Sequence, residues 1–188
     1  MVPADTHNED ERPDAAVRGL TIRYDPAEDR LIIQLGRRAG GQQESLALAL
    51  TRRVWRGFRF NLQTMLDRSS DLPPAMDPGV RHVLSAAHHQ AQAARVPVRV
   101  QKAAPLPSGF RADLIVGVRC GQRRSDRRWL ITFKVEGKPD VPLVLNDLGL
   151  HAMANALFRR ETATGWDLPR LPIANVAGAD LSKPPALH

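Results

Sequence analysis

The chain has 188 residues, of which 43% are hydrophobic and 25% are charged, a composition typical of a folded domain with its own core. No apolar run approaches the roughly 18 residues that a membrane-spanning helix needs. The acidic, polar N-terminus is unlike a signal peptide, and the single cysteine, Cys120, excludes an internal disulfide. We therefore expect a cytoplasmic protein of one domain or two small intertwined ones.

Positive charge dominates most of the chain. The formal net charge is +7, and only four of the 27 basic residues are lysines. Residues 1–17 hold five acidic residues and one arginine, so this segment carries −4 and the remainder carries +11. A basic surface attracts polyanions, which indicates nucleic acid as a partner. Arginine enrichment is also typical of GC-rich genomes, so the sequence leaves both explanations open.

The first half of the chain predicts three strands followed by a helix. Residues 1–17 are poor in apolar residues and are predicted to be a disordered acidic tail. Within residues 18–70, alternating apolar residues predict strands over 20–24, 31–35 and 46–50, separated by turns. Thr51 is a suitable helix N-cap. After it, apolar residues recur at helical spacing: Val54, Trp55, Phe58, Leu62, Met65 and Leu66.

The centre and the second half repeat this plan after an interruption. Residues 71–111 predict a helical linker, with a helix that starts at Asp77 and Pro78 and ends near Arg95. The segment 96–100 predicts a short extra strand. Residues 112–168 again predict three strands and a helix, now with Asn146 as the N-cap and Gly165 at the end. Residues 169–188 form a Pro- and Ala-rich C-terminal tail.

The two halves match each other in order and in residue type. Strand, cap and helix residues recur at one constant separation: Leu48 with Leu143, Leu50 with Leu145, Thr51 with Asn146, Trp55 with Leu150, Phe58 with Met153 and Leu62 with Leu157. The match predicts an α+β fold made of two similar βββα units, joined by the helical linker. Because a three-stranded sheet cannot bury its apolar face alone, the units are expected to pair their sheets pseudo-symmetrically or to cover them with their own helices. In topology alone this organisation is similar to that of the Whirly- and PUR-type single-strand binders.

Arginines provide the candidate binding residues. Pairs of arginines fall in predicted turns, and Arg52, Arg53, Arg56 and Arg59 are expected on the polar side of the first helix. We expect one basic surface that contacts phosphates without reading base sequence. Its candidate residues are Arg37, Arg38, Arg52, Arg53, Arg56, Arg123, Arg124, Arg127 and Arg128. The leading function is thus a nucleic-acid-binding accessory protein. The alternative is a scaffold or adaptor that binds a protein, or a second copy of itself, through a sheet edge or helix face.

No catalytic, metal or cofactor pattern stands out. His82, His88 and His89 lack the i, i+4 spacing of metal ligands on a helix and are interpreted as solvent-facing. His151 is interpreted as a half-buried polar residue. Cys120 has arginine neighbours that would favour its thiolate, but it lacks an adjacent histidine to act as a base. We expect no cofactor and no metal, and an enzyme is the least favoured of the three function classes.

Overall fold

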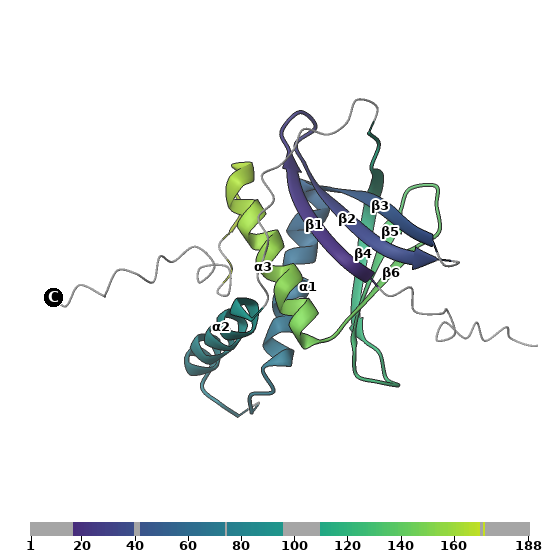
Figure 1. The fold of residues 1–188 in the computed structure, drawn as a ribbon. Coiled ribbons are helices and arrows are strands. Elements are labelled where there is room, and N and C mark those ends of the chain that lie inside the picture. Colours follow the sequence, from purple (N-terminus) through teal and green to yellow (C-terminus); the bar gives the residue numbers. More distant parts are fainter. Residues whose placement is uncertain (1–16, 40–41, 74, 96–109, 170, 172–188) are drawn as a thin grey trace, which may run out of the picture.

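The computed structural model describes residues 17–39, 42–73, 75–95, 110–169 and 171 (Figure 1). The predicted strand at 96–100 and nearly all of the two predicted tails, 1–17 and 169–188, lie outside the described residues. The elements in chain order are β1 (Val17–Asp25), β2 (Arg30–Ala39), β3 (Gln42–Thr51), α1 (Arg52–Ser69), α2 (Pro78–Ala94), β4 (Asp113–Gln122), β5 (Trp129–Val135), β6 (Val141–Leu145) and α3 (Asp147–Thr164). Among the described residues, no helix is both long enough and apolar enough to cross a membrane.

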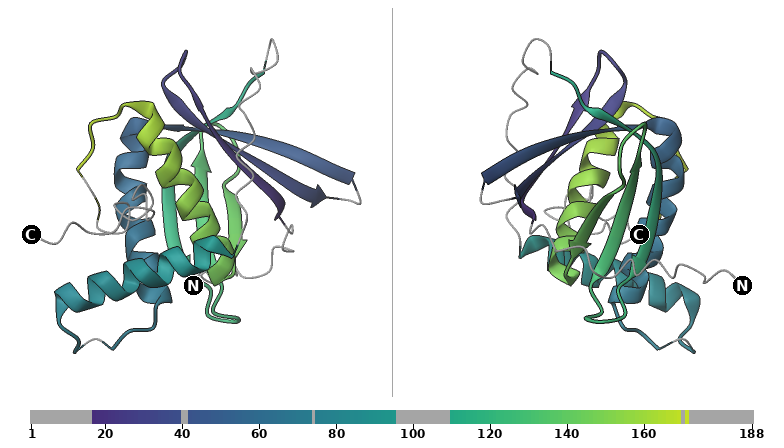
Figure 2. Two further views of the ribbon diagram at one scale, coloured as in Figure 1. Left: turned by 60° about the vertical axis from the view of Figure 1, so that its left-hand side comes forward. Right: turned by 90° about the vertical axis from the view of Figure 1, so that its right-hand side faces the viewer.

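The six strands form one mixed sheet in the order β1–β2–β3–β4–β5–β6. Strands β1 to β3 and strands β4 to β6 are two antiparallel meanders. A short parallel pairing joins them, in which Leu48 lies opposite Asp113 and Ala49 opposite Leu114. The strands of the two meanders run in clearly different directions (Figure 2). The predicted α+β class is confirmed, with a single six-stranded sheet in place of two separate ones.

Helices α1 and α3 lie on one side of the sheet, and α2 packs against both of them (Figure 1). Helices α1 and α3 each pack on strands from the other half of the chain. Helix α1 follows β3 but packs chiefly on β4, and α3 follows β6 but packs chiefly on β1. A helix that covers only its own half, which was one of the expected arrangements, is therefore not what the structure shows.

The helices begin and end where the sequence predicts. The Thr51 side chain accepts a hydrogen bond from the Val54 N–H (3.4 Å), and the Asn146 side chain accepts one from the Gly149 N–H (2.8 Å). Each cap satisfies one of the free N–H groups at a helix start. Gly165 ends α3 in the left-handed conformation, with φ at 68°, which glycine adopts without steric cost.

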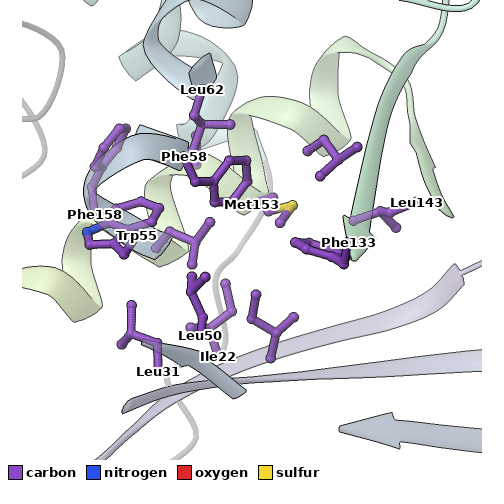
Figure 3. Close-up of a cluster of buried hydrophobic side chains, with 14 of the residues drawn as sticks. Ile22, Leu31, Leu50, Trp55, Phe58, Leu62, Phe133, Leu143, Met153 and Phe158 are labelled. Carbon is purple, nitrogen blue, oxygen red and sulfur yellow. The ribbon is translucent and has the colours of Figure 1, made fainter. Parts of the chain in front are cut away.

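The core lies between the helices and the concave side of the sheet (Figure 3). Phe58 packs edge-on against both Trp55 and Phe133, with ring centroids 5.7 and 6.1 Å apart, and Trp55 also contacts Phe158. This aromatic cluster joins α1 to β5 and α3, so it belongs to both halves of the chain. The predicted core positions on α1 and α3 are all buried: Trp55, Phe58, Leu62, Leu150, Met153 and Leu157.

Replacing Phe58 with alanine should lower the free energy of unfolding by about 3–5 kcal/mol, because it removes a buried ring and leaves a cavity. Urea unfolding followed by tryptophan fluorescence measures the change. Phe60 provides the matched control, since it lies on the same helix but is 49% exposed. Phe60→Ala should leave stability nearly unchanged, and an equal loss in both variants would show that the buried face of α1 is misassigned.

Candidate functional site

The candidate arginines do not gather on one rim. Arg37 and Arg38 belong to strand β2, where they lie opposite Glu44 and Gln43, and not to a turn as predicted. They adjoin the start of β3, whereas Arg123 to Arg128 follow the end of β4. Because β3 and β4 are parallel, the start of one and the end of the other point toward opposite ends of the sheet. The direction of the strands therefore separates Arg37 and Arg38 from Arg123 to Arg128, and the expected continuous basic rim is not formed.

The β4–β5 turn holds four arginines around one carboxylate. The Arg123 N–H donates to the Arg128 carbonyl (2.7 Å) and closes the turn. The Asp126 carboxylate accepts from Arg123 Nε (3.0 Å) and from the Arg128 N–H (3.1 Å). Hydrogen bonding from the Arg123 guanidinium, assisted by the Arg128 N–H, lowers the pKa of Asp126 to about 2. Asp126 is thus an anion at any ordinary pH and fixes the shape of the turn.

Arg124 and Arg127 are the outward-facing arginines of this turn. Both are exposed, and neither side chain has an ion pair with another described residue. Arg127 has a φ of 58°, in the left-handed region that residues other than glycine seldom occupy. Two arginines, Arg123 and Arg128, therefore shape the turn through Asp126, and the other two leave their charge available to a ligand.

The first turns of α1 form a second basic group. Arg52, Arg53 and Arg56 are exposed, and the first turn of the helix contains no acidic residue. Arg52 Nη2 donates to the Asp167 carbonyl (3.0 Å), while Arg53 and Arg56 make no ion pair with the rest of the described chain. The free N–H groups of a helix start carry positive partial charge, so arginines there add to a field that already attracts anions.

Arg59 is not on the polar side of α1, as predicted, but is buried. Its Nη2 lies 3.1 Å from Glu161 Oε1 on α3, and Trp55 Nε1 donates to Glu161 Oε2 (2.9 Å). Burial lowers the pKa of Arg59 and raises that of Glu161. The attraction between the two charges acts against both shifts. Arg59 Nε and Nη1 have no hydrogen-bond partner among the described residues. This pair links the start of α1 to the end of α3 and is not part of an exposed surface.

Two histidines, one interpreted as solvent-facing and the other as half-buried, are fully buried. His89 Nδ1 and His151 Nδ1 lie 2.8 Å apart, and His151 Nε2 lies 3.0 Å from the Ser69 hydroxyl oxygen. The Ser69 hydroxyl donates to the Leu66 carbonyl (2.7 Å), so its oxygen accepts from His151 Nε2–H. His151 Nδ1 then accepts from His89 Nδ1–H, which assigns one tautomer to each ring. The solvent-facing interpretation of His89 was wrong, and so was the half-buried one of His151.

A second polar contact next to the histidines attaches α2 to α1. Asp67 accepts hydrogen bonds from the Ser85 hydroxyl (2.8 Å) and from Gln63 Nε2 (3.0 Å) through the same carboxylate oxygen. Ser85 and His89 lie one turn apart on α2 and are both buried. Their shared face was visible in the sequence, but the partners Asp67 and His151, which lie far away in the chain, were not.

This polar cluster does not have the geometry of a reactive or metal-binding site. Burial lowers the pKa of His151 to about 3 and that of His89 to about 4, with the neighbouring histidines adding to the effect. Both rings are therefore neutral at pH 7. In the described part of the chain, no three His, Cys, Asp or Glu side chains are grouped so that they could hold a metal ion. Burial raises the thiol pKa of Cys120 to about 11, opposite to the effect expected from its arginine neighbours.

Comparisons with protein families, with curated proteins and with solved structures each found no match for this chain.

The buried histidines should make stability depend on pH. Folding lowers the pKa of both histidines. The stability that depends on their staying neutral is therefore fully present above about pH 6.5 and is lost as the pH falls toward 4. Each histidine contributes up to about 1.4 kcal/mol per pH unit in that range. Urea unfolding between pH 7 and pH 5 measures the slope, in a window above the usual carboxylate pKa values.

The control separates these two histidines from the others. The double variant His89→Gln, His151→Gln should show a shallower pH slope than the parent protein, whatever its absolute stability. His82 is exposed on the same helix, so His82→Gln should leave the free energy of unfolding at pH 7 nearly unchanged. An unchanged slope in the double variant would contradict the assignment of the pH dependence to the buried pair.

Proposed function

We propose that this protein is a non-enzymatic accessory protein that binds nucleic acid through phosphate contacts. The observation that carries the proposal is the free charge at two places on the surface. Arg53 and Arg56 on α1, and Arg124 and Arg127 in the β4–β5 turn, are exposed and have no carboxylate partner among the described residues. A guanidinium of this kind binds a phosphate through two parallel hydrogen bonds.

The remaining candidate arginines support these two groups. Arg52 extends the group on α1, and Arg123 and Arg128 hold the turn in shape while adding to its charge. Arg37 and Arg38 lie at the far end of β2, and we propose them as a third contact for a long ligand. Because the groups are separated, a single strand that can bend between them suits the surface better than a short rigid ligand.

The aromatic residues favour phosphate contacts over base stacking. The chain has nine aromatic residues, and only Phe60 among them is exposed. Proteins that bind single strands by stacking present several exposed rings to the bases. Binding here should therefore depend steeply on salt and only weakly on base sequence.

Changing both Arg124 and Arg127 to glutamate should weaken binding to all sequences alike. Fluorescence anisotropy with single- and double-stranded DNA and RNA, over a salt series, measures the affinity. Each lost phosphate contact should reduce the slope of log K against log salt by about 0.7 to 0.9. The same change at Arg53 and Arg56 tests the second group. Stability should change little, because exposed charges contribute little to folding.

The matched control carries the same charge change at a different place. Arg68 and Arg159 are exposed on α1 and α3 but belong to neither group, so Arg68→Glu with Arg159→Glu should weaken binding much less. An equal loss in the control would mean that only net charge matters. Absence of binding by the parent protein at low salt would refute the proposal and favour the scaffold or adaptor function, for which the exposed apolar residues of α2 are the supporting observation.

We also propose that the two halves arose by duplication of one βββα unit. Three features support this: the matching order of elements, the matching N-caps at Thr51 and Asn146, and the reciprocal packing of α1 on β4 and α3 on β1. Sequences of homologous proteins provide the test. Averaged over many homologues, residues 46–66 should align with residues 141–161 better than with any other segment of the chain. A best alignment elsewhere would contradict the duplication.

A further inference from the structure

Helix α2 presents an apolar stripe to the outside. Val80, Val83 and Leu84 are 51%, 69% and 42% exposed, and they are three of the five large hydrophobic residues that are exposed in the described chain. Their spacing places them on one face of the helix. Alanines continue the same face toward the end of α2 and are also exposed: Ala87, Ala91 and Ala94.

The opposite face of α2 packs against α1 and α3. Ser85 and His89 make the buried polar contacts to α1 and α3, and Ala86 and Ala93 are buried beside them. Among the described residues, the outer stripe therefore takes no part in attaching α2 to the rest of the chain. An apolar stripe of this length on an exposed helix is typical of a surface that binds another helix.

We propose that α2 is a self-association surface, which binds α2 of a second copy of the chain in antiparallel orientation. The stripe has a bulky half, formed by Val80, Val83 and Leu84, and a small half, formed by the alanines. Antiparallel pairing about Ala87 places each bulky half on the small half of the other copy. Val83 then meets Ala91, so that side chains of complementary size fill the contact.

Charge at the ends of α2 favours the same partner and orientation. Asp77, whose carboxylate caps the start of the helix, and Arg95, which follows its end, are both exposed. Helical spacing places both on the same flank of the stripe. In an antiparallel pair, Asp77 of one copy lies beside Arg95 of the other, and the helix dipoles oppose each other favourably. The stripe itself carries no charged residue, so two positively charged chains can meet there without repulsion at the contact.

The expected association is weak because one helix supplies it. Stable interfaces bury about 800 Å² per partner, and a single pair of helices of this length buries less. The self-association should therefore become measurable only at protein concentrations from about 10 µM to 1 mM, which correspond to a weak free energy of binding.

Sedimentation equilibrium over that concentration range tests the proposal on the full chain. The parent protein should shift from monomer toward dimer as its concentration rises. Val83→Glu should reduce the association at least tenfold, because it places two carboxylates in the contact. Val116 on β4 is 53% exposed and is the control, since Val116→Glu should associate like the parent. A parent protein that stays monomeric throughout, or a control as defective as Val83→Glu, would overturn the proposal.

Cysteine cross-linking tests the orientation, in chains where Cys120 is replaced by serine. Under mild oxidation, Ala87→Cys should form a disulfide-linked dimer. Val83→Cys and Ala91→Cys should each cross-link poorly alone but efficiently when mixed, because these two positions face each other only in the antiparallel pair. Efficient cross-linking of each variant alone, with no gain on mixing, would refute the antiparallel arrangement. Absence of any cross-link at Ala87, Val83 or Ala91 would refute α2 as the contact.

Discussion

The rest of the structure depends on how the two meanders are held together. The strands themselves do little of this, because β3 and β4 are paired only at Leu48–Asp113 and Ala49–Leu114. The helices supply the connection instead, since α1 covers β4 and α3 covers β1. Each half thus buries its apolar strands under a helix that belongs to the other half. Neither meander therefore has a complete core of its own, although the two have the same order of elements.

Buried polar contacts fix the positions of the helices over this shared core. At one end of the α1–α3 pair, Glu161 binds both Arg59 and Trp55, and at the other end His151 contacts Ser69 and His89. Apolar packing between helices tolerates sliding, whereas hydrogen bonds and a buried ion pair have defined partners. Removal of one partner alone leaves a buried group unpaired, which is more destabilising than replacement of both. These contacts therefore select one register of α1 against α3.

Local features of the chain were predictable, and partners that lie far apart in sequence were not. Strands, helices, caps and the apolar face of each helix follow from the spacing of residues such as Trp55, Phe58 and Leu157, and from Thr51, Asn146 and Gly165 at the helix ends. Spacing does not reveal that Arg59 meets Glu161 or that His89 meets His151. Helix α2 departs from the rule that apolar side chains face the core, because the polar Ser85 and His89 face inward and the valines face solvent.

For the candidate basic surface too, local structure was predictable from the sequence and spatial neighbours were not. The turn that holds Arg123 to Arg128 was predictable, because polar residues separate two alternating apolar runs. The role of Asp126 in shaping that turn depends on side-chain geometry, and the separation of Arg37 and Arg38 from it depends on the direction of strand pairing. A hydrophobic pattern gives the face of a strand but not its neighbours or its direction within the sheet.

The reciprocal covering of the two halves has a consequence for synthesis of the chain. Strand β1 is the first described element to be made, and its cover, α3, is the last. Likewise, α1 can contact β3 at once, but its chief partner β4 and the Phe133 ring of β5 are translated later. At 5–20 residues per second, a nascent chain carries the exposed Trp55, Phe58 and Leu62 for on the order of ten seconds before their partners emerge. The native packing of the first half is therefore complete only after α3 has emerged from the ribosome.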